Sequence, residues 1–146
     1  MPQVAVVTDS TANLPPEMAA AHDVTVVALY VVFGPERTER EPDITDYAAF
    51  FDELRGAESL PSTSQPSVGD FMAAYEPLLA HGLDVVSIHI SAGLSGTYDS
   101  AVQAAEQLAR DGKGGERIRV IDSATVAGAL GLVVLGAYEN SIRKET

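Results

Sequence analysis

The chain has 146 residues, about the length of one globular domain, and its 46% hydrophobic and 21% charged residues place it near the average soluble protein. Disordered, collagen-like and low-complexity classes are therefore excluded. The formal net charge is −12, from nine basic and 21 acidic residues, and the basic residues do not cluster. Because such a chain repels phosphate backbones and anionic headgroups, we expect neither nucleic acid nor a charged membrane surface as its partner.

The sequence contains no cysteine, which excludes disulfides, thiolate nucleophiles and sulfur-ligated metals and fits a reducing compartment. Its first residues lead directly into a strand-like run, without the basic and apolar regions of a secretory signal. The most apolar stretch, residues 126–138, is 13 residues long, shorter than the roughly 20 that a membrane-spanning helix needs. These features predict a cytoplasmic globular protein.

Short runs rich in Val and Ile alternate with longer segments of helical periodicity. In chain order, the predicted strands are residues 4–7, 24–33, 85–90 and 118–121, and the predicted helices are residues 15–21, 45–54, 67–79, 95–109 and 126–138. Nearly continuous Val and Ile content is typical of parallel strands that are covered on both faces. The sequence therefore predicts one α/β domain over residues 1–146, a layered sheet of mostly parallel strands flanked by helices.

Local signals mark several element ends. Ser67 followed by Asp70 predicts a capping box with Asp in the usual place of Glu. Residues 34–43 are polar and contain proline, which indicates a loop or an edge excursion. Residues 111–115 predict a glycine-rich turn before the last strand.

Hydroxyl-bearing residues gather where ligands bind in open parallel sheets, beyond the carboxyl ends of the strands. The pattern Asp-Ser followed by Thr occurs after two strands, at residues 9–11 and 122–125. Two interpretations stay open, because Asp, Ser and Thr at such positions form caps and turns as readily as they line a crevice. Residues 62–67 would lie close by if the helix that follows them crosses back onto the sheet.

The loop at residues 91–97 is the most specialised of these segments. Gly93 and Gly96 permit close approach of the backbone to a ligand, and Ser91, Ser95 and Thr97 are small hydrogen-bond donors. This combination suits a carboxylate or phosphate at a helix N-terminus, although a plain strand-to-helix turn would use similar residues.

Standard catalytic and metal-binding patterns are not matched. The nucleophile elbow G-x-S-x-G fails around Ser95 because Thr97 stands at the second glycine, and neither a P-loop nor G-x-G-x-x-G is present. His89 lies inside a predicted strand, which favours a packed histidine over a general base. The histidines lack metal-ligand spacing, so we expect no metal site. Because the catalytic and nucleotide-binding patterns are not matched either, we expect no catalytic residue and no cofactor.

Four segments occur in a diagnostic order: residues 7–15 (VTDSTANLP), 63–67 (TSQPS), 87–98 (SIHISAGLSGTY) and 120–123 (VIDS). Together they resemble the N-terminal domain of the DegV family of bacterial fatty-acid-binding proteins, over residues 4–135. The resemblance implies a DegV-like α/β fold and a non-enzymatic protein. Its ligand would be a long-chain fatty acid with its tail in an apolar tunnel, presented to a separate fatty-acid kinase.

The same resemblance implies that Thr63 and Ser95 contact the carboxylate of the fatty acid. Further residues expected to line the site are Ser10, Ser62, Ser64, Ser91, Gly93, Gly96, Thr97 and Ser123. The sequence departs from the family pattern at Ala92, where a serine is usual, and at residues 41–43, near a usual Asp-Gly.

Members of the family also carry a second domain that forms the other wall of the tunnel, and we expect it to be absent here. The chain would then be truncated, naturally short or a fragment. Its apolar segment, residues 126–138, would pair with the missing domain or with a second copy.

Two other classes of function stay open. One is an enzyme of acyl or phosphoryl transfer that uses Ser95 as nucleophile, with Asp9 or His89 assisting. The other is a non-catalytic interaction domain whose exposed helix pairs with itself or with another chain.

Overall fold

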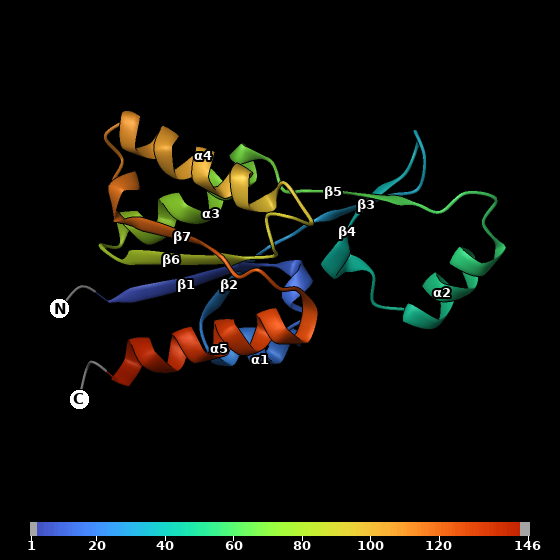
Figure 1. Cartoon of the computed structure of the whole chain (residues 1–146), viewed down its shortest axis with the longest axis horizontal. Helices are drawn as coiled ribbons and strands as arrows, with labels where there is room; N and C mark the ends of the chain where they lie inside the picture. The colour runs from blue at the N-terminus through green and yellow to red at the C-terminus, as the bar shows by residue number, and fades with distance from the viewer. Residues whose placement is uncertain (1–2, 144–146) are drawn as a thin grey trace.

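The computed structural model describes residues 3–143, and a four-stranded parallel sheet forms its centre (Figure 1). The strand order is β2-β1-β6-β7, and every neighbouring pair is parallel. This arrangement confirms the predicted α/β class and parallel sheet. The strands are β1 (Val4–Asp9), β2 (Val24–Val27), β6 (Asp84–His89) and β7 (Ile118–Asp122).

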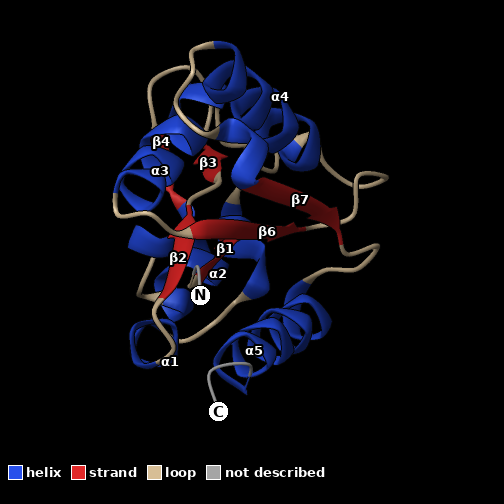
Figure 2. Cartoon of the chain, turned by 90° about the vertical axis from the view of Figure 1, so that its left-hand side faces the viewer, coloured by secondary structure: helices blue, strands red, loops and turns tan. Residues whose placement is uncertain are grey.

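Helices cover both faces of this sheet, as the apolar strands require (Figures 1 and 2). Val7 packs with the buried residues of α3 and α4 on one face, whereas Val6 packs with those of α1 and α5 on the other. Successive side chains of one strand therefore enter separate cores. The helices are α1 (Pro16–Ala21), α3 (Val68–Ala80), α4 (Thr97–Arg110) and α5 (Ala127–Arg143), and a 3-10 turn (Gly115–Arg117) precedes β7.

A second, smaller sheet projects beyond the carboxyl end of the main sheet. Its strand order is β4-β3-β5, with antiparallel pairing, and Figure 1 shows it on the right together with α2. We call residues 30–64 the side lobe. It contains β3 (Tyr30–Val32), β4 (Thr38–Arg40), a 3-10 turn (Glu41–Asp43), α2 (Tyr47–Gly56) and β5 (Ser62–Ser64).

The side lobe corrects one prediction and decides between the alternatives of another. The single strand predicted at residues 24–33 is divided into β2 and β3. Its backbone leaves the main sheet at Leu29, whose N–H donates to Ser10 Oγ and whose carbonyl accepts from the Glu41 N–H. The segment predicted as a loop or edge excursion contains β4, an edge strand of the second sheet.

Helix punctuation follows the sequence closely. The predicted capping box forms, because Ser67 Oγ accepts from the Asp70 N–H at 3.0 Å and Asp70 Oδ2 accepts from the Ser67 N–H at 2.8 Å. The helix predicted at residues 126–138 continues to Arg143. Among residues 3–143, no helix combines the length and the apolar composition needed to cross a bilayer.

Candidate functional site

A cavity of about 450 Å³ lies between the carboxyl edge of the main sheet and the side lobe, a size typical of small-molecule sites. Most of its wall is apolar. Its apolar residues come from β3, from α2, from the segment that precedes α2 and from the loops that follow β2, α2 and β6. They are Leu29, Val31, Ile44, Phe50, Leu54, Leu60, Pro61, Ile90 and Leu94.

The polar side chains of the wall come from both sides of the cavity. Thr11 and Asn13 follow β1, and Ser95 precedes α4. The side lobe adds Tyr30, Glu41, Tyr47 and Thr63. Glu41 is the single charged side chain among the residues that line this cavity, so the wall offers hydroxyl and amide groups but no cation.

Thr63 and Ser95 lie in the wall of the same cavity although Thr63 belongs to β5 of the second sheet and Ser95 to the loop between β6 and α4. Thr63 is the central residue of β5 and pairs with Val31 of β3. Ser95 directly precedes Gly96, the N-cap of α4, and its Oγ lies 2.9 Å from Thr97 Oγ1. The N–H of Thr97 also donates to Ser95 Oγ, so the serine hydroxyl is held over the first turn of α4.

Three other serines predicted to line the site, Ser10, Ser91 and Ser123, lie outside the cavity wall. Ser10 is buried, and its hydroxyl donates to Glu41 Oε2 at 2.5 Å and accepts from the Leu29 N–H. Ser91 Oγ accepts from the Gly93 N–H, and Ser123 Oγ accepts from the Thr125 N–H. These hydroxyls therefore fix loops around the cavity.

The remaining predicted residues also lie beside the cavity rather than in its wall. Ser62 and Ser64 flank Thr63 on exposed β5 and, by strand alternation, face away from the side on which Thr63 lies. Gly93 is exposed, Gly96 caps α4 and Thr97 is buried in its first turn.

Sequence reasoning did not single out several residues of the wall. Asn13 has a left-handed backbone (φ 50°), which asparagine tolerates, and follows the Asp-Ser-Thr pattern after β1. The sequence signal for Asn13 was its position in the segment of residues 7–15, one of the four segments that resemble the family pattern. Tyr30, Tyr47 and Glu41 carried no such signal, because only the folding of the side lobe brings them to the cavity.

A buried hydrogen-bond chain lies beside the cavity. Asp9 Oδ2 lies 3.0 Å from His89 Nδ1, His89 Nε2 lies 2.6 Å from Ser87 Oγ, and Ser87 Oγ lies 2.7 Å from the hydroxyl of Tyr75. All four residues are inaccessible to solvent. His89 is therefore the packed histidine that the strand pattern favoured.

Asp9 joins this chain to the cavity wall. Its Oδ2 also accepts from the Ile90 N–H and its Oδ1 from the Thr11 N–H, so one carboxylate fixes two segments of the wall. Burial alone would raise the pKa of Asp9. The hydrogen bonds from His89 and Thr11, the electrostatic interaction with His89 and the Ile90 N–H outweigh burial and hold the pKa of Asp9 below its ordinary value. Burial also raises the pKa of Tyr75 well above its usual range.

The contacts of Ser95 do not form a nucleophile and base pair. Both ring nitrogens of His89 are engaged, by Asp9 and Ser87, and the Ser95 hydroxyl is paired with Thr97. An activated serine would need a base within hydrogen-bond reach. Within residues 3–143, no group of three or more His, Asp or Glu side chains is placed to hold a metal ion.

The two Asp-Ser patterns form turns at the ends of their strands. Asp9 accepts from the backbone N–H two residues later, and Asp122 does the same with Ala124. Asp122 also accepts from the N–H of Ala92, which links the end of β7 to the loop after β6. Of these two patterns, only the first contributes a residue, Thr11, to the cavity wall.

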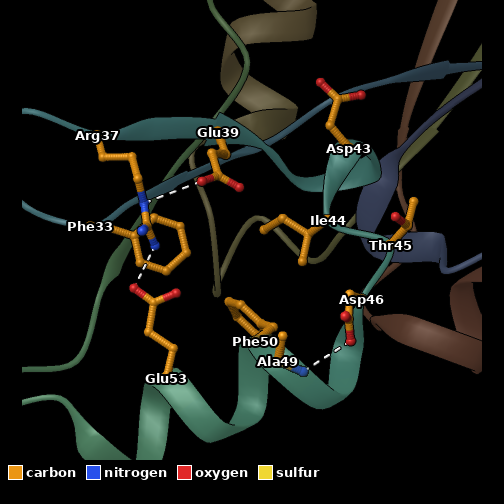
Figure 3. Close-up of a pocket in the computed structure, with 10 residues that line it drawn as sticks. All are labelled: Phe33, Arg37, Glu39, Asp43, Ile44, Thr45, Asp46, Ala49, Phe50 and Glu53. Atoms are coloured by element: carbon orange, nitrogen blue, oxygen red, sulfur yellow. Dashed lines mark hydrogen bonds and ion pairs between the residues drawn. The ribbon is translucent and has the colours of Figure 1, made fainter.

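A second pocket, of about 270 Å³, lies on the other side of Ile44 and Phe50 and is shown in Figure 3. The guanidinium of Arg37 lies 3.7 Å from the centre of the Phe33 ring and forms ion pairs with Glu39 and Glu53. This cluster joins α2 to β3 and β4. Phe50 lines both pockets, so this cluster lies directly behind the wall of the apolar cavity.

Comparison with known proteins adds a family. A model described as an uncharacterised protein of the DegV family matches residues 3–141. A DegV domain-containing protein of Deinococcus radiodurans is 42% identical over 136 residues, which cover 93% of this chain and 46% of that protein. The family model and this relative both belong to the family that the four sequence segments resemble.

Two solved structures share the fold. DegV of Bacillus subtilis, described as a fatty acid binding protein, matches with a TM-score of 0.84 and 38% identity over 98% of this chain and 49% of that one. A DegV family protein of Thermus thermophilus, described by its fatty acid binding, matches with a TM-score of 0.83 and 34% identity over 97% and 48%. The chain spans about half the length of these relatives.

Proposed function

The chain belongs to the DegV family, and we propose that it binds a long-chain fatty acid in the apolar cavity, with the carboxylate held by Thr63 and Ser95. One observation carries the proposal. Thr63 and Ser95 are far apart in the sequence and lie in different parts of the fold, yet both hydroxyl-bearing side chains reach the wall of one mainly apolar cavity. Solved relatives described as fatty acid binding support the ligand class.

The composition of the cavity suits the two ends of such a ligand. Each methylene of the tail gains about 0.8 kcal/mol on leaving water. The carboxylate loses hydration and needs donors in return, and each hydrogen bond to a charged group contributes about 1.5–3 kcal/mol. The apolar wall therefore provides affinity, and the two hydroxyls provide orientation. The positive end of the α4 dipole lies next to Ser95 and favours the same negative charge.

Binding to the purified chain tests this proposal directly. Native mass spectrometry should detect copurified fatty acid, and titration of delipidated protein should saturate at one ligand per chain. Thr63→Ala combined with Ser95→Ala should weaken binding at least about tenfold. Ser62→Ala combined with Ser64→Ala is the matched control, because these serines share β5 but lie outside the cavity wall.

Two outcomes would reject the proposal. The first is that the chain takes up no fatty acid at any concentration, which would exclude fatty acid as its ligand. The second is that the Thr63→Ala and Ser95→Ala double variant binds fatty acid as tightly as the control variant, which would show that other residues hold the carboxylate.

We further propose that the bound acid is presented to a fatty-acid kinase, as the family resemblance implies. Thr63 is exposed, so a carboxylate beside it would be open to a second protein. In the kinase reaction a carboxylate oxygen attacks the terminal phosphorus of ATP, an acyl phosphate forms and ADP leaves. Acyl phosphate production by such a kinase should require this chain and should fall with Thr63→Ala. Equal production without the chain would exclude this role.

A further inference from the structure

A contact between Gln65 and Gly96 joins the two segments that carry the proposed carboxylate ligands. Gln65 lies two residues beyond Thr63, at the end of β5, and Gly96 directly follows Ser95. A Cβ atom built on Gly96 would lie 2.8 Å from Gln65 Nε2 and 3.1 Å from Gln65 Cδ. Real Cβ atoms essentially never show the shorter of these separations, so a Cβ at position 96 would force the far end of the Gln65 side chain to shift.

The backbone does not explain this glycine. Gly96 has φ −74° and ψ 4°, a conformation that any L-residue adopts. Glycine at position 96 therefore matters for the placement of the Gln65 side chain rather than for its own backbone conformation. Gly93, in the same loop, differs, because a Cβ there would meet only Ser91 Oγ at an ordinary 3.5 Å.

We propose that Gln65 is a positioning residue, which packs on Gly96 and thereby sets the separation of the Thr63 and Ser95 hydroxyls. Thr63 belongs to the side lobe and Ser95 to the loop before α4, so their relative position depends on contacts between those two parts. The proposal rests on the fatty-acid binding inferred above. Gln65 is exposed, so displacing its side chain should change the site more than it changes the stability of the fold.

The ligand-free protein gives the first test. Gly96→Ala should displace Gln65 and shift the backbone amide resonances of Thr63 and Ser64 in ¹H–¹⁵N spectra. Gly93→Ala should leave those resonances in place. Unchanged Thr63 and Ser64 resonances in Gly96→Ala would overturn the proposal, whether or not the chain binds a fatty acid.

A double-mutant cycle gives the second test. Gly96→Ala and Gln65→Ala should each weaken fatty-acid binding about three- to tenfold, and the double variant should be no weaker than either single variant, because both remove one contact. If Gly96→Ala weakened binding by disturbing the start of α4 instead, its effect would add to that of Gln65→Ala. Additive effects, or binding by Gly96→Ala equal to that of Gly93→Ala, would overturn the proposal.

The two tests separate this proposal from the proposed function. Shifted Thr63 resonances in a protein that takes up no fatty acid would retain the positioning contact and reject the ligand. Wild-type binding that weakens with Thr63→Ala but not with Gly96→Ala would retain the ligand and reject the positioning role of Gln65.

Discussion

Glu41 is the residue whose charge acts most directly on the proposed ligand, since it is the single charged side chain in the cavity wall described above. It is held there by the hydroxyl of Ser10. A fatty-acid carboxylate in the same cavity would be repelled by it. Glu41→Gln should therefore tighten binding by roughly 1 kcal/mol, about fivefold, and raised salt should reduce the difference.

The matched control is Asp43→Asn, which removes the same charge from the same 3-10 turn but does not line this cavity. Isothermal titration at two salt concentrations measures both variants. Equal tightening by the two substitutions would show that net charge, rather than the position of Glu41, governs the affinity.

Because Asp9 is paired with His89 in the buried hydrogen-bond chain, we expect the free energy of unfolding to fall at acid pH. The pKa of Asp9 is held below its ordinary value of 3.8, so its contribution to stability is complete above that value. It is lost as the pH falls through the lower pKa of the folded state. Asp9→Asn should destabilise the protein by about 2–4 kcal/mol at neutral pH, because it weakens a buried hydrogen-bonded pair.

Urea unfolding at a series of pH values measures this effect. From about pH 5 to pH 3 the wild type should lose more stability than Asp9→Asn. Asp122→Asn is the control, since Asp122 forms the same turn at the end of a strand but is exposed. Parallel pH profiles for wild type and Asp9→Asn would contradict this account.

At the residue level the sequence and its motifs pointed to Thr63, Ser95 and the packed His89 for different reasons. His89 followed from its position inside an apolar strand and Thr63 from the resemblance, whereas Ser95 followed both from the resemblance and from the glycine- and hydroxyl-rich loop at residues 91–97. Glu41 could not be identified as part of a cavity wall, because its place depends on the backbone leaving the main sheet at Leu29.

At the level of elements, the side lobe is held less firmly than the main sheet. No residue of α2 is buried, and all three residues of β5 are exposed. By contrast, the last four residues of β1 are buried. Exposed backbone hydrogen bonds with few apolar contacts open at low free-energy cost.

Hydrogen–deuterium exchange should therefore be at least about tenfold faster for α2 and β5 than for β1 and β6. Added fatty acid should slow exchange in α2 and β5, because the ligand would pack between the side lobe and the main sheet. Exchange in β7 should stay unchanged, since it contributes nothing to the cavity wall. Uniform protection across both sheets, or slowing confined to β7, would contradict this prediction.

The difference in burial between the main sheet and the side lobe also explains which elements could be predicted from the sequence. Strands β1, β2 and β6 place residues in the cores on both faces of the main sheet and are rich in Val and Ile, so their pattern is strong. The Ser-Thr-Ser sequence of β5 has no apolar alternation, and its pairing with β3 supplies the only reason for it to be extended. The division of residues 24–33 is likewise a tertiary effect, without glycine or proline at the break.

At the scale of the whole molecule, the net charge and the exposed apolar surface have opposite effects on association between copies of the chain. The net charge of −12 opposes contact between copies of the chain. On α5, Leu130 and Val134 are buried against the sheet, whereas Leu132 is 73% exposed and Val133 is 45% exposed. The outer face of the segment predicted to seek a partner, residues 126–138, is thus apolar in part.

We predict weak self-association through this face of α5, promoted by salt because salt screens the net charge. Sedimentation velocity at several protein concentrations should show a rising average mass at about 0.5 M NaCl and less at low salt. Leu132→Ser should suppress the rise without changing the charge. Leu60→Ser is the control, as Leu60 is 76% exposed but lies on the side lobe. If Leu60→Ser alone abolished association, the contact would lie at the cavity mouth rather than on α5, and added fatty acid should then compete with it.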